Sequence, residues 1–191
     1  VAGKVQNSPN IYLRKNPSQT AEVVSEVHMA STELAEQAIQ SAQQAYATWK
    51  KVNAHERAQL LDKAADLMVL NKYSLIATQI LEVGKPWAEA DGDVAEAIDF
   101  LRYYARHMRE LAQPLRVGHS PGEISQYIYK PRGVVAVIAP WNFPLAILTG
   151  QVAAALVTGN TVVMKPAEQS SLVAQGLFEI LSECLQQAGL P

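Results

Sequence analysis

Two short segments of the sequence carry side chains capable of chemistry, and each follows an apolar run typical of a buried strand. The first is Pro140-Trp-Asn-Phe-Pro144, in which two prolines bracket an amide and two aromatic rings. Prolines restrict the backbone, so this loop should hold those side chains in place. An amide donor fixed at the end of a strand can stabilise a developing oxyanion, which makes Asn142 a candidate catalytic residue. Spacing alone equally allows a structural role, with Asn142 capping the next helix and both rings in the core.

The second segment is Lys165-Pro-Ala-Glu168. In open parallel sheets, ligands bind beyond the carboxyl ends of the strands, and dinucleotide-binding folds place an acidic side chain there against ribose hydroxyls. Glu168 is a candidate for that role, and Lys165 would add a donor. The alternative is a surface ion pair of little energetic value. Because the chain contains neither Gly-x-Gly-x-x-Gly nor a Walker-type glycine loop, the residues alone favour nucleotide binding only slightly.

Other catalytic and metal-binding patterns find little support. His28, His55, His107 and His119 are not paired at ligand spacing, so we expect no metal site. A serine nucleophile of the Gly-x-Ser-x-Gly type is absent from the sequence. The single cysteine, Cys184, cannot form an internal disulfide or a thiolate metal site. It is either an inert core residue or the only possible thiol nucleophile of the chain.

The elements that would position the two segments follow one another as strand, helix, strand and helix. Residues 133–139 and 161–165 are apolar and β-branched, the composition of strands covered on both faces. Helical stretches follow over 145–157 and from a loop at 166–171 to about residue 189. Connections of this length allow the two strands to be parallel.

Four helices are predicted before this region, after a loop and edge-strand segment at the start of the chain. Apolar residues recur at steps of three and four after Ser31, after Asn53 and again through residues 75–83, where Gly84-Lys-Pro86 should end the helix. The most regular pattern runs from Trp87 to Leu111. Its spacing also fits a coiled coil, but its small alanines favour a buried core helix.

Charged residues occupy the other side of this 87–111 helix, and the structural interpretation is a solvated face with ion pairs one turn apart. They are Glu89, Asp93, Glu96, Arg102, Arg106 and Arg109. Further along, residues 123–130 alternate with a period of two, which predicts a half-exposed antiparallel strand.

Composition restricts the class of protein. The 191 residues suit one domain, and 49% hydrophobic with 18% charged residues is ordinary for a globular chain. The formal net charge of -2 lacks the basic excess that nucleic-acid or anionic-membrane binding requires, so we expect neither partner. Without an apolar stretch of about 18 residues or a signal-like start, and with one cysteine, the chain is predicted to be cytoplasmic or processed before its first residue.

Taken together, the segments resemble the aldehyde dehydrogenase superfamily. The motifs are Gly133-VVAVIAPWNFPLAI-Leu148 and Gly159-NTVVMKPAEQ-Ser170, in order and at that family's spacing, and the resemblance runs from about Ile11 to Pro191. Within the superfamily, Glu82-VGKPWAEADGDVAEAIDFLRYYA-Arg106 looks most like the delta-1-pyrroline-5-carboxylate (L-glutamate gamma-semialdehyde) dehydrogenases. In many bacteria that activity is the carboxyl-terminal half of the bifunctional proline-utilisation protein.

The resemblance implies NAD-dependent oxidation of L-glutamate gamma-semialdehyde to L-glutamate in proline degradation, by a homo-oligomer. In that family a cysteine thiolate attacks the carbonyl, hydride passes to the nicotinamide, and a glutamate-activated water releases the acyl group. Two alternatives stay open. One is another semialdehyde dehydrogenase, such as one acting on succinic semialdehyde, and the other is a truncated, non-catalytic module for nucleotide binding or assembly.

Roles for single residues around the first motif follow from the same match. Asn142 corresponds to the asparagine that donates its side-chain amide to the oxyanion. Phe143 corresponds to an aromatic wall of the aldehyde channel. The residues that would line the cofactor are Ile138, Ala139, Pro140 and Trp141.

Four further residues receive implied binding roles. Lys165 and Glu168 match the pair that holds the adenosine ribose, and a carboxylate there would repel a 2′-phosphate, which favours NAD over NADP. Glu96 and Phe100 lie one turn apart on a helix that borders the substrate tunnel in the resembling branch. A carboxylate near a substrate amino group suits an amino-acid aldehyde, while the solvated face remains an equal alternative for Glu96.

The implied fold is α/β and aldehyde-dehydrogenase-like, with a helical layer, the first part of a Rossmann-like parallel sheet and an oligomerisation strand or hairpin. Edge strands and the helical layer would span 1–113, the oligomerisation segment 114–132, and an incomplete βαβα part of the NAD-binding domain 133–191. The chain ends before the family's glycine-rich turn, general-base glutamate and nucleophilic cysteine, and Cys184 matches no catalytic position. We therefore expect an amino-terminal fragment that is inactive by itself.

Overall fold

Strands and helices alternate along the computed structural model, which describes residue 1 and residues 4–190. The strands are β1 (Ile11–Asn16), β2 (Gln19–His28), β3 (Leu115–Arg116), β4 (Gln126–Tyr127), β5 (Val134–Ile138) and β6 (Thr161–Lys165). The helices are α1 (Thr32–Trp49), α2 (Ala54–Leu70), α3 (Lys72–Val83), α4 (Trp87–Leu111), α5 (Ala146–Val157) and α6 (Ser171–Gln187), with a 3-10 turn, η1 (Glu168–Ser170), before α6.

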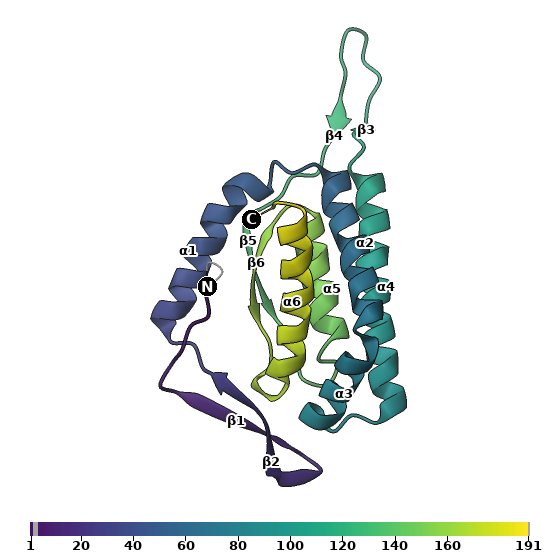
Figure 1. The fold of residues 1–191 in the computed structure, drawn as a ribbon. Helices are drawn as coiled ribbons and strands as arrows, with labels where there is room; N and C mark the ends of the chain where they lie inside the picture. The colour runs from purple at the N-terminus through teal and green to yellow at the C-terminus, as the bar shows by residue number, and fades with distance from the viewer. Residues whose placement is uncertain (2–3, 191) are drawn as a thin grey trace.

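The parallel pair β5 and β6 lies at the centre of the layers (Figure 1). Helix α1 packs on one side of the pair, and α5 packs on the other. Beyond α5 and α6 lie α2 and α4, which run along each other, while α3 contacts α4, α6 and the β1–β2 hairpin. The predicted succession of strand, helix, strand and helix with a parallel pair is confirmed.

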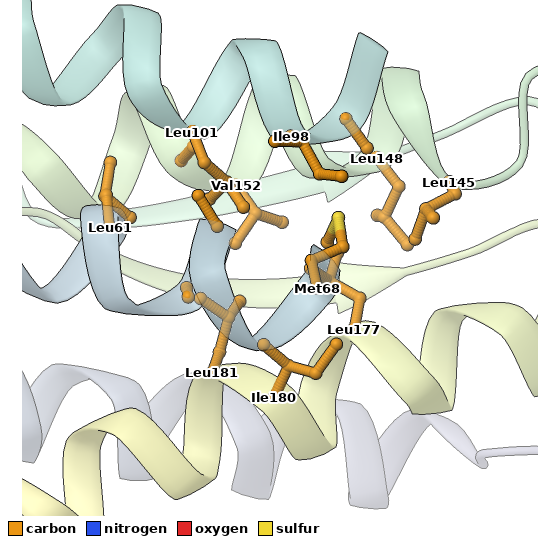
Figure 2. Close-up of a cluster of buried hydrophobic side chains, with 14 of the residues drawn as sticks. Leu61, Met68, Ile98, Leu101, Leu145, Leu148, Val152, Leu177, Ile180 and Leu181 are labelled. Carbon is orange, nitrogen blue, oxygen red and sulfur yellow. The ribbon is translucent and has the colours of Figure 1, made fainter. Parts of the chain in front are cut away.

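The main core forms where α2, α4, α5 and α6 meet (Figure 2). Its side chains are almost completely removed from water, and apolar burial of this kind is the dominant favourable contribution to folding. The labelled members are Leu61, Met68, Ile98, Leu101, Leu145, Leu148, Val152, Leu177, Ile180 and Leu181. Because α4 packs against α2, α3 and α5, it is a core helix, as predicted, and not half of a coiled coil. None of the described helices has the length and apolar character needed to cross a membrane.

The predicted helix ends are confirmed by their capping geometry. The Ser31 hydroxyl accepts a hydrogen bond from the main-chain N–H three residues on, at 3.3 Å, and caps α1. The Asn53 side chain accepts from the N–H two residues on, at 2.8 Å, and caps α2. Gly84 ends α3 with φ of 70°, the left-handed conformation that glycine adopts most easily. A Cβ atom at this position would also lie only 2.9 Å from Cγ of Pro17.

Strand β5 pairs with β6 in simple register, from Val134 opposite Thr161 to Ile138 opposite Lys165. The prediction that this strand is covered on both faces is wrong, because Ala136 is exposed and Ile138 is 67% exposed. Within the described residues, β5 has a neighbouring strand on one edge only. Alternate side chains of a strand point to opposite faces, so Val137 is buried on one face while Ala136 and Ile138 lie on the other, exposed face.

Two antiparallel hairpins lie outside the parallel pair. Strands β1 and β2 form an antiparallel hairpin in the segment at the start of the chain where loop and edge strand were expected. The strand predicted over 123–130 is shorter, because only Gln126 and Tyr127 pair, with β3. This β3–β4 hairpin projects from the body of the molecule (Figure 1), so alternate side chains such as Ile124 and Ile128 have no core to face.

Candidate functional site

The carboxyl ends of β5 and β6 lie side by side. Ile138 pairs with Lys165, and the main-chain N–H of Ala139 donates to the Lys165 carbonyl at 3.3 Å. This edge of a parallel sheet is where α/β folds bind their ligands. The register thus brings together the candidate cofactor residues of both segments, namely Ile138, Ala139, Pro140, Trp141, Lys165 and Glu168.

The Lys165 and Glu168 side chains form a loose pair at the end of β6. The distance from Lys165 Nζ to Glu168 Oε2 is 4.0 Å, and both side chains are exposed. Gln169 donates to the other carboxylate oxygen at 3.0 Å. An exposed pair of this length contributes little to stability, and its polar atoms remain accessible to a ligand.

Asn142 lies exposed in the loop between β5 and α5. Helix α5 begins at Ala146, with a residue other than Asn142 at its N-cap, so the capping alternative is wrong. The hydrogen bond that holds Asn142 uses its main-chain carbonyl, which leaves the side-chain amide available to another molecule. The rings of Trp141 and Phe143 are 54% and 42% exposed, so they do not fill the core either.

A buried ion pair supports this loop from the connection between α3 and α4. Lys85 Nζ lies 3.6 Å from Oδ1 of Asp93, and the two side chains are 7% and 0% exposed. The same Nζ donates to the main-chain carbonyl of Asn142 at 3.1 Å. It also lies 4.2 Å from the centroid of the Phe143 ring, which is a cation–π contact. The Lys85 ammonium therefore joins an acidic side chain to two consecutive loop residues.

Asp93 also caps α5, although it belongs to α4. Its carboxylate accepts from the main-chain N–H groups of Leu145 at 3.2 Å and Ala146 at 3.4 Å. Burial raises the pKa of Asp93 above its ordinary value, against the opposing effects of the Lys85 ammonium and the two N–H donors. Helix α5 has no capping side chain of its own, so this contact between helices supplies the cap.

Neither member of the pair is recognised as functional from the sequence. Lys85 is read only as part of a helix-ending turn, and the assignment of Asp93 to a solvated face is wrong. One signal was present, since Asp93 lies three residues after Ala90 and directly before Val94, within the apolar stripe of the helix. An acidic side chain in such a stripe indicates a buried partner, because an unpaired charge there is costly.

A second buried carboxylate caps the helix that follows β6. Glu82, in the last turn of α3, is fully buried and accepts from the N–H groups of Leu172 at 2.6 Å and Val173 at 3.0 Å. Burial raises the pKa of Glu82, against the opposing effects of these two N–H groups and of Arg14. The Arg14 guanidinium donates to the main-chain carbonyl of Glu82 at 2.6 Å.

Glu96 and Phe100 lie further along α4 and line a separate shallow pocket. Its lining is completed by Asp99 and Tyr103, whereas the pocket beside the 140–144 loop is lined by residues 83–86, Glu89 and residues 141–143. The structure therefore does not bring Glu96 and Phe100 into the pocket that holds Asn142. The Phe100 ring packs over Gly150 of α5, where a Cβ atom would lie 3.1 Å from the ring.

Cys184 is fully buried in α6, and burial raises the pKa of its thiol. Of the two alternatives for Cys184, the structure supports a core residue, and a raised pKa makes the thiol a poor nucleophile. Over residue 1 and residues 4–190, no group of three or more His, Cys, Asp or Glu side chains is placed to hold a metal ion.

Comparison with known proteins identifies one family model and several curated relatives that match this chain. A model of the aldehyde dehydrogenase family matches residues 5–191. The chain is 49% identical, over 92% of its length, to 1-pyrroline-5-carboxylate dehydrogenase 1 of Halalkalibacterium halodurans, of which it covers 33%. It is 48% identical over the same share to 1-pyrroline-5-carboxylate dehydrogenase 2 of Bacillus subtilis, again covering 33%.

Solved structures that resemble this chain include proteins of the same names or of the related proline utilization A. Proline utilization A from Bdellovibrio bacteriovorus, inactivated by N-propargylglycine, matches with a TM-score of 0.95 and 64% identity, over 96% of this chain and 19% of that one. The 1-pyrroline-5-carboxylate dehydrogenase from Thermus with bound NAD matches with a TM-score of 0.93 and 43% identity, over 96% and 36%. The chain spans about a third of the length of the curated relatives that it matches. From the fold, the motifs and these matches, we conclude that the chain belongs to the aldehyde dehydrogenase family.

Proposed function

We propose that the protein containing this chain oxidises L-glutamate gamma-semialdehyde to L-glutamate, with NAD as hydride acceptor, in proline degradation. Family membership and relatives named 1-pyrroline-5-carboxylate dehydrogenase support this proposal. The observation that carries it is the accessible Asn142 amide, which lies beside the paired ends of β5 and β6.

In this proposal, Asn142 stabilises the negative charge that develops on the aldehyde oxygen. When a thiolate adds to the carbonyl carbon, the π electrons of the C=O bond move to the oxygen, and the side-chain N–H donates to it. A donor fixed before the reaction is effective because it needs no reorganisation as the charge forms. Cys184 is buried and has a raised thiol pKa, so the attacking thiolate would come from outside residues 1–191.

The end of the parallel pair suits an adenine dinucleotide. Lys165 and Glu168 offer a donor and an acceptor for ribose hydroxyls, and the exposed apolar surfaces of Ile138 and Trp141 lie at the end of β5. Bound NAD would supply a two-electron acceptor for the hydride of the aldehyde. The carboxylate of Glu168 would repel a 2′-phosphate, so NAD is preferred over NADP. Residues 133–191 would then be the first βαβα part of an NAD-binding domain, with 1–113 as its helical layer and 114–132 as a bridging segment.

Phe143, in the pocket beside Asn142, and Glu96 with Phe100, in the separate pocket along α4, would contact different ends of an amino-acid aldehyde and distinguish it from other aldehydes. The Glu96 carboxylate is exposed on α4 and would attract a substrate ammonium group. Phe143 is partly exposed and would form one wall of the aldehyde path. Succinic semialdehyde has no amino group, so it would gain nothing from Glu96.

Steady-state kinetics of the full-length protein test this proposal. We expect a higher kcat/KM with L-glutamate gamma-semialdehyde than with succinic semialdehyde, and a higher kcat/KM with NAD than with NADP. Asn142→Ala should lower kcat by about 100-fold or more, the typical effect of losing one oxyanion donor. A preference for succinic semialdehyde would overturn the substrate assignment, and an unchanged kcat in Asn142→Ala would overturn the role of the amide.

The β3–β4 hairpin is proposed to contact a second copy of the chain. It projects from the body (Figure 1), and several of its apolar side chains are exposed. These are Leu115, Val117, Ile124 and Ile128. Ile124→Asp should shift the protein to a smaller species in sedimentation, because a charge in an apolar interface is costly. Leu70→Asp is the matched control, since Leu70 is equally exposed but lies at the far end of α2; an unchanged mass in Ile124→Asp would contradict the proposal.

A further inference from the structure

We propose that Lys85 and Asp93 are positioning residues for Asn142. Their buried ion pair holds the 140–144 loop and the start of α5, so that the Asn142 amide is fixed where the oxyanion forms. This inference rests on the proposed function of Asn142.

The 140–144 loop is held mainly by side chains from outside it. Main-chain hydrogen bonds secure its two ends, from Ala139 N–H to the Lys165 carbonyl and from Ile147 N–H to the Phe143 carbonyl, each at 3.3 Å. Between these ends, the attachments are the Lys85 ammonium on the Asn142 carbonyl at 3.1 Å and on the Phe143 ring. Lys85 therefore acts on the main chain of the residue whose side chain must be placed.

Asp93 fixes the lysine and the helix start together. It lies 3.6 Å from the ammonium and accepts from the first two N–H groups at the start of α5, those of Leu145 and Ala146. A buried charge is tolerated only where its partners satisfy it, and both members of this pair have several. Lys85 thus holds the middle of the loop, and Asp93 holds the start of the helix that follows it. Because the two side chains are paired, both attachments belong to one buried group of contacts.

A second lysine–aspartate pair between α3 and α4 gives a matched control. Lys72 Nζ lies 2.6 Å from Oδ1 of Asp91, which is closer than in the buried pair. Its side chains are 32% and 41% exposed, however, and neither residue lines the pocket beside the 140–144 loop. If charge pairing between these helices were all that mattered, removal of Lys72 would resemble removal of Lys85.

A double-mutant cycle in the full-length protein tests the inference. Lys85→Met, Lys72→Met, Asn142→Ala and the double variant Lys85→Met/Asn142→Ala are compared by kcat and by the Kd for NAD. We expect Lys85→Met to lower kcat by about tenfold to 100-fold, the usual effect of a small misplacement of a catalytic group. The Kd for NAD should change by less than about twofold, and Lys72→Met should leave both values unchanged. In the Asn142→Ala background, Lys85→Met should have less than about a twofold further effect, because the amide it positions is gone.

Lys85→Met leaves Asp93 buried without its cation and can prevent folding, so Lys85→Met/Asp93→Asn serves as the second variant. It removes both charges and also removes the attachment to the Asn142 carbonyl. Multiplicative effects of Lys85 and Asn142 variants would overturn the positioning role while leaving the proposed function intact. An unchanged kcat in Asn142→Ala alone would overturn the role of Asn142, and the positioning role with it. The two failures are thus distinguishable.

Discussion

The loops after β5 and after β6 share the same kind of helix cap but differ in whether a buried cation holds the loop itself. Each leads into a helix that lacks a capping side chain of its own, and each helix start is capped by a buried carboxylate from the helical layer. Asp93 performs this role for α5, and Glu82 performs it for α6. After β5 the cation paired with the carboxylate also reaches the loop. After β6 the neighbouring Arg14 instead contacts the main chain of Glu82 itself.

This difference separates a fixed loop from an adjustable one. Lys85 holds the main chain of Asn142, whereas Lys165 and Glu168 extend from the β6 end as exposed side chains in a loose pair. A donor to a reacting atom needs a position defined within a fraction of an ångström. Groups that bind ribose hydroxyls tolerate side-chain adjustment. Under the proposed function, the stronger scaffold thus lies under Asn142, whose proposed role has the stricter geometric requirement.

Removing the carboxylate under the fixed loop should have the largest effect on stability. Asp93→Ala leaves the Lys85 ammonium buried without a counterion and two N–H groups without an acceptor, so we expect a loss of about 3–5 kcal/mol in the free energy of unfolding. Urea titration of the variant measures it. Asp91→Ala, in the exposed pair, is the control and should change stability by less than about 1 kcal/mol. Equal effects of the two variants would show that burial of the Asp93 pair is unimportant.

Glu82→Gln should have a smaller effect on stability. The amide keeps one oxygen to accept from Leu172 or Val173 and loses the other, so one N–H group is left without a partner. We expect a loss of about 1–3 kcal/mol in the free energy of unfolding, measured in the same way. A loss larger than that of Asp93→Ala would reverse the proposed ranking of the two loops.

Glu168→Ala should change cofactor selectivity without affecting stability. The carboxylate is exposed and loosely paired, so its removal costs the fold little, but it removes the repulsion of a 2′-phosphate. We expect the ratio of kcat/KM for NAD to that for NADP to fall by about tenfold in the full-length protein. Glu179→Ala, an exposed glutamate of α6, is the control and should leave the ratio unchanged. An unaltered ratio in Glu168→Ala would remove the evidence that the second loop acts on the ribose.

The smallest expected effect is a dependence of the free energy of unfolding on pH, caused by the buried Glu82 carboxylate. Burial raises its pKa in the folded protein above the unfolded value. In the pH window between these two values, the unfolded chain has released the proton while the folded chain retains it, so the free energy of unfolding falls as pH rises. The glutamine of the Glu82→Gln variant does not titrate, so this variant lacks the pH-dependent contribution. The stability of the wild type minus that of Glu82→Gln should therefore decrease with rising pH just above the ordinary glutamate pKa, and an increase would contradict the raised value.

Much of the fold was predictable because its signals are local. Gly84, Asn53 and Ser31 end or begin helices through bonds to residues only a few positions away. The alternation of β5, α5, β6 and α6 follows from apolar runs and their periods. The short β4 strand was not predictable, because the period of two is the same whether or not a core exists to receive one face. Burial of β5 likewise depends on what packs over each face of the strand and not on its own composition.

For the site, the sequence by itself determined which residues can do chemistry and the order of the elements that hold them. Asn142, Lys165 and Glu168 were identified from residue type and from their place after apolar runs. Only the tertiary structure decided what supports them, because the partners are distant along the chain. Asp93 reaches an N–H group 52 residues away, and Glu82 reaches one 90 residues away. The environment of a charge is set by what packs around it. Asp93, which the sequence pattern assigned to a solvated face, is therefore buried in the fold, where it caps the start of α5 and pairs with the lysine that holds Asn142.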